Sequence, residues 1–585
     1  MSLSASVSQS YPRWVPNLSE SKPVDYGING VLAKPVFDRH YSIEPMLRAG
    51  YLGKLLKENY VHANRQLLSI DSRLMRGDLN LSMDDSDVKD FCRAKARGCK
   101  DIIIRHRPEN AEKLIRAKLV VYGIEYKADI DLVWSDFERF QDECWWRRQV
   151  RKIQARELDE IARSMRIVHA KKQIYTSTNN VLNRRKQNAR NRALMSEYIA
   201  TNQEGQEYTL QELSDLSVSN PEIRRSELMV RIAGFEKVAD ARDMVGEFYT
   251  LTCPSKYHPM LTSYQTYTEN GNKKKRFKGC YENPNYKGAT VRDAQKYLSN
   301  LFARIRADLA RRGIGVFGFR VSEAHHDGCP HWHLLLFMAR GDSGPCRSVF
   351  RKYALLEDGG EVGALKHRFK AERIDKSKGT AAGYIAKYIS KNINGVGMEG
   401  ENDLFGVEVV GSSERVQAWA SCHGVRQFQQ IGGPCVGVWR ELRRLASEDC
   451  PESIEGFRAA ADASDWAAYV ELMGGPFCGR NQELKMARWH EVDTETGEFI
   501  DAPVGRYGDD TEGKIIGLLT SCGEVICTRF YSWVVERSSR IRQSVLTVSE
   551  SLHSMTLDDL VESGFFSVYG AQAPPWSPVN NCTVS

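Results

Sequence analysis

Residues 316–338 read VFGFRVSEAHHDGCPHWHLLLFM, two apolar runs separated by the pair Asp327-Gly328. An Asp-Gly pair between apolar runs is a strong signal for a tight turn. We therefore predict two antiparallel strands, over 315–323 and 331–338, that form a β-hairpin. Because side chains alternate between the faces of a strand, the two histidines of the motif His-Trp-His are expected to share one face.

The histidine pair His331 and His333 is a candidate clamp for a divalent metal ion, since imidazole binds Mn, Zn and Co readily and Mg less so. A hard cation also favours an oxygen ligand. Glu323 on the preceding strand is the first candidate for a third ligand, and His325 is the second. Alone, the histidine pair is more typical of partly buried, hydrogen-bonded side chains, but together the carboxylate strand, the turn and a downstream tyrosine pair favour a metal site.

That tyrosine pair lies in AAGYIAKYISKNI, which predicts a helix over roughly residues 380–393. At about 100° per residue, Tyr384 and Tyr388 lie about 40° apart around the helix axis. Lys387 and Lys391 fall on the same side, and the isoleucines take the opposite half. The pattern predicts an apolar face that packs and a second face that carries two phenols and two ammonium groups.

Tyrosine has a pKa of about 10, so a phenol that attacks phosphorus at neutral pH needs help. Nearby lysines favour the phenolate, and a metal ion would polarise the scissile phosphate. A metal site together with paired tyrosines therefore favours phosphodiester chemistry through a covalent protein–DNA bond. The alternative is an amphipathic helix with a tyrosine-rich packing surface.

Further elements surround the hairpin. The β-branched and aromatic run EFYTLTCP, which begins at Glu247, predicts a strand that ends at Pro254. A loop with the basic cluster KKKRFK (273–278) is expected next, followed by a helix that Thr290 caps and Gly313 ends. The order strand, helix, strand, strand, helix predicts an open antiparallel sheet with helices on one face, an α+β arrangement.

The domain organisation that we predict has five parts. They are a disordered N-terminus (1–25), a mainly helical, basic region that contacts DNA (26–240), the α+β module (241–446), a small α/β accessory region (447–570) and a flexible tail (571–585).

Composition sets broad limits on the function. No apolar run reaches the length of about 20 residues that a membrane helix needs, so we expect no membrane partner. The first residues, MSLSASVSQSYPRWVPNLSES, lack the features of a secretory signal, which predicts a cytoplasmic location. The 14 cysteines include no C-x-x-C pair, and we expect reduced thiols.

Positive charge is concentrated in one region. Residues 145–192 hold 14 Lys and Arg against three acids, a local net of +11, although the whole chain has a net charge of only +7. Such density is typical of segments that contact phosphate backbones, and the alternative is a solvated helix face. Trp145 and Trp146 either stack on bases or belong to a core. The candidate DNA-binding residues are Arg147, Arg148, Arg184, Arg185, Lys186, Lys274, Lys275 and Arg276.

The order of three motifs resembles that of HUH endonucleases, the single-strand nickases of rolling-circle replication. They are FYTLT (248–252), E-x-H-x-D-G-x-P-H-W-H (323–333) and Y-x-x-x-Y (384–388). More closely, the chain resembles the replication gene A protein family of temperate tailed phages, through TLTCPSKYH (250–258), PHWHLLLF (330–337), YIAKYISKN (384–392) and RQFQQIGGPCVGVWRELRRL (426–445). The resemblance covers about residues 145–445 and is weaker towards both ends.

The resemblance implies an HUH endonuclease module, an antiparallel sheet with flanking helices. His331 and His333 would bind Mg²⁺ or Mn²⁺, with Glu323 completing the set. Tyr384 and Tyr388 would alternate as nucleophiles. One would cleave the origin, keep the 5′-phosphate as a phosphotyrosine and leave a 3′-OH primer. The other would cleave the regenerated origin, and the new 3′-OH would then close a circle.

Other classes of protein share some of these motifs. A conjugative relaxase usually places its tyrosine before the histidine motif, whereas a two-tyrosine HUH transposase keeps the order seen here. A non-catalytic DNA-binding factor is the alternative from another class. The Walker-like string GDDTEGKI (508–515) lacks the Ser or Thr that contacts magnesium and carries acids that would repel phosphates. We therefore expect origin DNA, single-stranded or locally melted, and a separate helicase and replication machinery from the bacterial host as partners.

Overall fold

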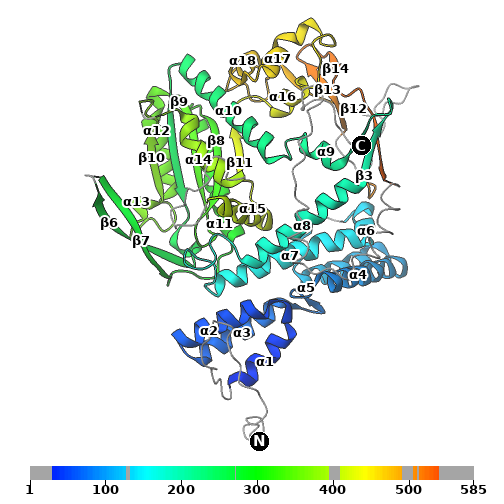
Figure 1. The fold of residues 1–585 in the computed structure, drawn as a ribbon, viewed down its shortest axis with the longest axis vertical. Coiled ribbons are helices and arrows are strands. Elements are labelled where there is room, and N and C mark those ends of the chain that lie inside the picture. The colour runs from blue at the N-terminus through cyan, green and yellow to red at the C-terminus, as the bar shows by residue number, and fades with distance from the viewer. Residues whose placement is uncertain are drawn as a thin grey trace, which may run out of the picture.

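A computed structural model of the chain describes residues 29–126, 132–269, 272–377, 379–393, 409–489, 505–509 and 513–538. Within these ranges the protein is a mixed α+β structure whose sheets are built from antiparallel strand pairs (Figure 1). The predicted α+β class is thereby confirmed. The predicted disordered N-terminus, 1–25, and flexible tail, 571–585, lie outside the described residues.

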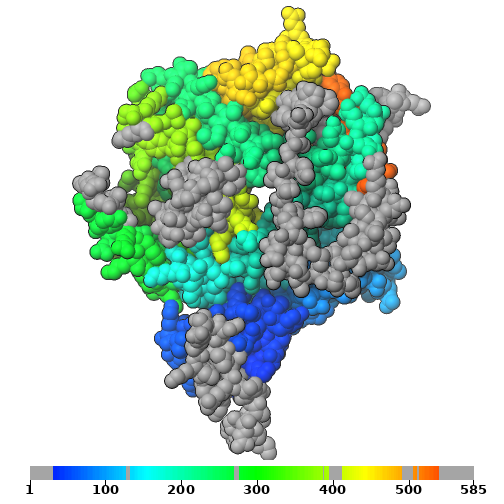
Figure 2. All heavy atoms as spheres, viewed as in Figure 1, coloured from blue at the N-terminus to red at the C-terminus, as the bar shows by residue number. Residues whose placement is uncertain are grey.

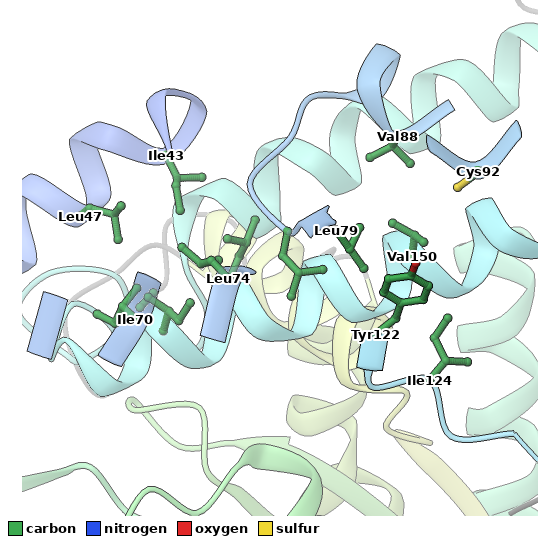
Figure 3. Close-up of a cluster of buried hydrophobic side chains, with 14 of the residues drawn as sticks. Ile43, Leu47, Ile70, Leu74, Leu79, Val88, Cys92, Tyr122, Ile124 and Val150 are labelled. Carbon is green, nitrogen blue, oxygen red and sulfur yellow. The ribbon is translucent and has the colours of Figure 1, made fainter. Parts of the chain in front are cut away.

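The N-terminal part is helical, as expected. Its helices are α1 (Asn29–Arg39), α2 (Glu44–Lys57), α3 (Tyr60–Leu74), α4 (Asp85–Arg105), α5 (Pro108–Tyr122), α6 (Trp134–Phe140) and α7 (Glu143–Ser164), with the short 3-10 helix η1 (Tyr41–Ile43) and the small pair β1 (Met75–Arg76) and β2 (Leu79–Asn80). Apolar side chains from these helices form one buried cluster, part of which Figure 3 shows. Trp145 and Trp146 are buried in this cluster, so the base-stacking alternative is wrong for them.

A second helical stretch connects this part to the central sheet. It comprises α8 (Thr178–Glu197), β3 (Tyr198–Asn202), β4 (Glu207–Thr209), α9 (Leu210–Asp215) and α10 (Pro221–Ala241). Asn220 caps α10 by accepting a hydrogen bond from the backbone N–H of Glu222, and Pro221 occupies the first turn. In α8 only Asn180 and Val181 are buried, so this basic helix is mostly surrounded by solvent.

The central sheet has five strands in the order β10-β5-β9-β8-β11, and each neighbouring pair is antiparallel. The strands are β5 (Met244–Thr252), β8 (Phe317–Ala324), β9 (Pro330–Ala339), β10 (Phe369–Arg373) and β11 (Phe428–Ile431). The predicted strands near 247, 315 and 331 are confirmed, whereas β10 was not predicted. It is a short edge strand, FKAER, with little apolar character.

Helices cover both faces of this sheet, so the predicted packing on one face is wrong. The helices are α11 (Val291–Arg311), α12 (Ser343–Ala354), α13 (Ala364–His367) and α14 (Ala381–Ile393). Strand β9 explains the two layers, because it is buried on both faces. Its residues Leu334 and Leu336 pack with α11 and α12, while Leu335 and Phe337 pack with α10 and α14 (Figure 1).

The basic cluster lies on a hairpin and not in the loop that the sequence predicts. Strands β6 (Met260–Glu269) and β7 (Asn272–Glu282) pair with each other and form a separate two-stranded sheet. Short 3-10 turns, η2 (Ser255–Tyr257) and η3 (Arg340–Asp342), lie before β6 and after β9.

The C-terminal part extends the molecule beyond the sheet. It holds α15 (Val409–His423), α16 (Val436–Leu442), α17 (Glu452–Asp462), α18 (Trp466–Leu472), β12 (Leu484–Trp489), β13 (Lys514–Thr520), β14 (Val525–Cys527) and β15 (Trp533–Arg537). Strands β13 and β14 form an antiparallel hairpin. Strand β15 instead pairs with β3, which lies more than 300 residues earlier in the chain. The space-filling view shows α17 and α18 in yellow above the central part (Figure 2).

Two expectations from composition can be compared with the described residues. None of the helices in the described ranges combines the length and apolar character that a membrane span requires. The thirteen cysteines that these ranges contain are free thiols.

Candidate metal centre and tyrosine helix

The β8–β9 hairpin positions the candidate ligands by its register. Glu323 lies directly opposite His331 across the ladder, and Val321 lies opposite His333. Gly328 adopts a φ of +80° in the turn, a conformation that glycine tolerates and most residues do not. The tight turn therefore sets a pairing in which one carboxylate and two imidazoles share the face covered by α14.

The three side chains converge on one point. Nε2 of His331 lies 3.0 Å from Nε2 of His333, and these atoms lie 3.7 and 3.6 Å from Oε2 of Glu323. One ligand atom from each residue lies within 4.8 Å of the others. Two imidazole nitrogens and a carboxylate oxygen at such separations form a donor set that suits a divalent cation, so the residues fit the metal that the sequence predicts.

His325 takes a different place from the one expected of a third ligand. Its ring packs against the ring of His331, with 4.1 Å between centroids, and Glu323 occupies the ligand position beside both histidines. Nε2 of His325 is buried without a hydrogen-bond partner. The geometry therefore favours Glu323 over His325 for that role.

A hydrogen bond from the neighbouring strand orients His333. Thr250 on β5 pairs with His333 in the sheet, and its Oγ1 lies 3.1 Å from Nδ1 of that ring. A partner at Nδ1 fixes the ring orientation and leaves Nε2 directed at the candidate ligand cluster. The motif FYTLT therefore contributes an orienting hydroxyl as well as a strand.

The electrostatics of the cluster suit metal binding. Burial, with the neighbouring His325 and His333, holds the pKa of His331 well below its ordinary value, so this ring is neutral. Burial would raise the pKa of Glu323, but Lys391 and His333 lower it below its ordinary value. A neutral imidazole and an ionised carboxylate are the forms that bind a cation.

Helix α14 begins where the sequence predicts and carries its apolar residues inward. The backbone N–H groups of Ala381 and Ala382 donate to the carboxylate of Glu236 on α10, which satisfies free donors at the helix start. Ile385 and Ile389 are buried against the sheet. This packing presents the other face of α14 to the candidate metal cluster.

Tyr388 lies directly against that cluster. Its ring centroid is 4.2 Å from that of His333 and 5.5 Å from that of Phe248, on which it stacks. Burial, followed by the charges of Glu323 and Glu372, raises the pKa of Tyr388 to about 12. The side chain is therefore a neutral phenol at pH 7, placed beside a candidate metal ligand.

The other candidates on α14 are placed as follows. Tyr384 lies one turn closer to the helix start and is half-buried. Nζ of Lys391 lies 3.9 Å from Oε2 of Glu323 and 5.0 Å from the centroid of the Tyr175 ring. The side chain of Lys387 lies outside the described residues.

Asn392 is a contributor that the sequence reasoning missed. Its side-chain amide donates to Oε1 of Glu323 at 2.6 Å, and Nε2 of Gln427 donates to its Oδ1 at 3.1 Å. Asn392 follows Tyr388 by four residues, so it belongs to the same helix face. This spacing could have indicated Asn392 from the sequence, whereas its contact with Gln427 depends on the tertiary fold.

We expect Asn392→Ala to weaken Mn²⁺ binding about 10- to 100-fold, because groups that orient a ligand carboxylate usually contribute at this level. Calorimetric titration of the purified chain with Mn²⁺ measures the change. Asn183→Ala, at an exposed position on α8, serves as the matched control. An affinity for Mn²⁺ within twofold of the unaltered chain would contradict an orienting role for Asn392.

The candidate DNA-binding residues are spread over three elements. On α7, Arg147 lies 3.6 Å from Glu143 and Arg148 donates to the Tyr507 hydroxyl. On α8, Arg185 forms an ion pair with Glu414, and Lys186 is exposed. Arg184 on α8 donates to Gln187, and Arg276 on β7 is exposed. Lys274 and Lys275 lie on β7, and their side chains are outside the described residues.

The fold and the site define an α+β protein with a buried candidate metal cluster beside a tyrosine helix. The sequence model for the bacteriophage replication gene A protein matches residues 109–396. The chain belongs to this bacteriophage replication gene A protein family, and the predicted resemblance is confirmed.

Individual relatives agree with this assignment. The replication gene A protein of Escherichia phage 186 is 34% identical over 579 residues, which cover 96% of this chain and 76% of that protein. A probable replication protein of Pseudoalteromonas phage PM2 is 38% identical over 68% of this chain and 58% of its own length. A probable replication endonuclease from a prophage-like region of Shigella boydii is 33% identical over 70% of this chain and 50% of its own length. No solved structure matches the chain.

Proposed function

We propose that the protein is a site-specific, single-strand DNA endonuclease that initiates rolling-circle replication of phage DNA. It would nick the origin, form a 5′-phosphotyrosine, leave a 3′-OH primer and later rejoin the strand. Relatives in the same family are named replication gene A protein and probable replication endonuclease, which supports a nuclease role in replication.

The observation that carries the proposal is the contact between a tyrosine and the candidate metal cluster. The Tyr388 ring lies 4.2 Å from the ring of His333, whose Nε2 converges with His331 and Glu323. A nucleophile and a cation site at this separation can act on the same phosphate group. The arrangement supports the HUH module and the metal ligands that the sequence predicts.

The proposed reaction conserves phosphodiester bonds. A tyrosine phenol loses its proton and its oxygen attacks phosphorus; the bond from phosphorus to the 3′ oxygen breaks, and that oxygen leaves as a 3′-OH. One phosphodiester is exchanged for another, so the reverse reaction rejoins DNA without ATP. A divalent cation, Mg²⁺ or Mn²⁺, held by His331, His333 and Glu323 would polarise the phosphate and offset its developing negative charge.

The Tyr388 phenol has to lose its proton for this step, against its surroundings. At neutral pH the phenol of Tyr388 keeps its proton, because burial and Glu323 raise its pKa to about 12. Lys391 lies beside Glu323 and offsets part of that negative charge. We propose that Lys391 and Lys387 favour the phenolate and that Tyr384, one turn away, is the second nucleophile for the regenerated origin.

The substrate is proposed to be single-stranded or locally melted origin DNA. Tyr388 is partly buried between the helix and the sheet, so it cannot reach a phosphate inside an intact duplex without rearrangement of the DNA. Unwinding would then fall to a helicase and replication machinery of the bacterial host. The basic residues of α7, α8 and β7 are proposed to hold the DNA backbone.

The proposal can be tested with a labelled single-stranded oligonucleotide from the origin region, incubated with the purified chain and Mn²⁺. We expect an adduct that resists SDS and that disappears after protease digestion. The same reaction in EDTA serves as the control. Tight DNA binding without an adduct on any origin-region oligonucleotide would favour a non-catalytic DNA-binding factor instead.

A further inference from the structure

The β6–β7 hairpin is a long two-stranded ribbon that stands apart from the central sheet. Ten residue pairs connect its strands, and within the described residues no third strand joins them. It extends outward at the left of the view (Figure 1). A ladder of this length spans about 30 Å, and an isolated two-stranded ribbon is only marginally stable in water. A binding partner would explain why the protein has this ribbon.

The surface of the ribbon has the composition of a DNA-contacting element. Five cations occupy six consecutive positions, KKKRFK (273–278). Arg276 and Lys278 are exposed, as are the large rings of Tyr264, Tyr267 and Tyr281. A protein-binding ribbon would be expected to carry one apolar face, whereas cations interleaved with aromatic rings are typical of contact with nucleic acid.

The root of the ribbon is fixed to the turn of the metal-site hairpin. Asn283 is buried, and its amide donates to the backbone oxygens of Ser255 and His258, each at 2.7 Å. Nδ1 of His258 in turn lies 3.0 Å from Oδ2 of Asp327, in the turn between β8 and β9. The ribbon is therefore held in a defined position relative to the candidate active site.

We propose that the β6–β7 ribbon is an arm that enters the major groove of duplex DNA next to the nicked strand. The inference rests on the proposed function, since it assigns the duplex side of the same DNA. The major groove is about 12 Å wide and admits a two-stranded ribbon. Arg276 and Lys278 are both exposed on β7, where they can contact phosphates at the edges of the groove.

The arm performs a task that the tyrosine site cannot perform. The active site takes a strand that is already unpaired, whereas initiation at an origin also requires that the adjoining duplex be held. Arg276 and Lys278 contact phosphates on the groove walls, and the tyrosines pack on the sugar edges. The rigid root fixes the distance from this grip to Tyr388.

The test compares binding of a short labelled duplex with binding of one of its strands, for the full chain between about 50 and 200 mM salt. In Arg276→Ala with Lys278→Ala, the slope of log affinity against log salt for the duplex should fall by about two. Each lost phosphate contact removes about 0.9. Duplex affinity should drop about tenfold or more, and the loss on the single strand should be smaller.

The matched control is Arg311→Ala with Arg340→Ala, which removes two exposed cations elsewhere, with side chains 66% and 60% exposed. It should leave both affinities and the salt slope unchanged. An arm variant with an unchanged duplex affinity and slope would overturn the proposal, and so would equal losses on duplex and single strand. The proposed function is tested separately by the adduct assay, in which it fails if the unaltered chain forms no SDS-resistant adduct.

Discussion

Replacing both Tyr384 and Tyr388 with Phe is expected to abolish the covalent protein–DNA adduct, by more than about a thousandfold in rate. Phe removes only the hydroxyl that attacks phosphorus. The ring of residue 388 can still stack on Phe248 and contact His333, so the fold should be retained. The adduct is measured on a denaturing gel with a labelled single-stranded origin oligonucleotide and Mn²⁺.

The single replacements separate the roles of the two tyrosines. An adduct should survive in either Tyr384→Phe or Tyr388→Phe, because each leaves one nucleophile. We expect the larger loss from Tyr388→Phe, since the Tyr388 ring directly contacts the candidate metal ligand His333. Tyr60→Phe, an exposed tyrosine of α3, serves as the control.

Two outcomes would contradict this assignment. An undiminished adduct in the double variant would place the nucleophile elsewhere in the chain. Complete loss in one single variant, with no effect of the other, would leave one working nucleophile and remove the basis for alternation. Melting temperatures close to that of the unaltered chain are required before either result is interpreted.

The parts of the site that could be predicted from sequence depend on local geometry. Strand alternation and the Asp327-Gly328 turn place Glu323 opposite His331, and the structure has this register. Helical spacing puts Tyr388 and Lys391 on the side of α14 that faces the cluster. Each of these relations spans fewer than about ten residues, where backbone periodicity decides the outcome.

The parts that could not be predicted depend on contacts between distant segments. Nothing local in FKAER indicates that β10 completes the sheet by pairing with β5. The pairing of β15 with β3 and the hydrogen bond from Gln427 to Asn392 depend likewise on the tertiary arrangement. Helices were predicted on one face of the sheet. They cover both faces because β9 is apolar on both of its sides.

The second large effect is expected at the candidate metal ligands. Replacing His331 and His333 together with Ala should abolish stoichiometric Mn²⁺ binding and the covalent adduct, because two of the three converging donors are lost. Glu323→Gln keeps the volume of the side chain and removes its negative charge. It should weaken Mn²⁺ binding and adduct formation strongly, with a smaller effect on stability. Calorimetry and the adduct assay measure these changes.

Thermal unfolding gives an independent readout of the metal ligands. A cation that binds only the folded chain should stabilise it by about 2.7 kcal/mol at a concentration 100 times its Kd. The unaltered chain should therefore melt at a higher temperature in Mn²⁺ than in EDTA, and the ligand variants should not show this difference. His62→Gln, at an exposed position on α3, should behave as the unaltered chain does.

The alternative for these residues is a structural hydrogen-bond network without a cation. Nε2 of His331 and Nε2 of His333 lie 3.0 Å apart, a contact that two neutral rings can make only if one of these nitrogens donates a proton. In that case the unaltered chain would melt at the same temperature in Mn²⁺ and EDTA, and Glu323→Gln would still form the adduct. That pair of results would refute the metal assignment and leave the tyrosine assignment standing, because the Tyr→Phe variants test the nucleophiles independently of the cation.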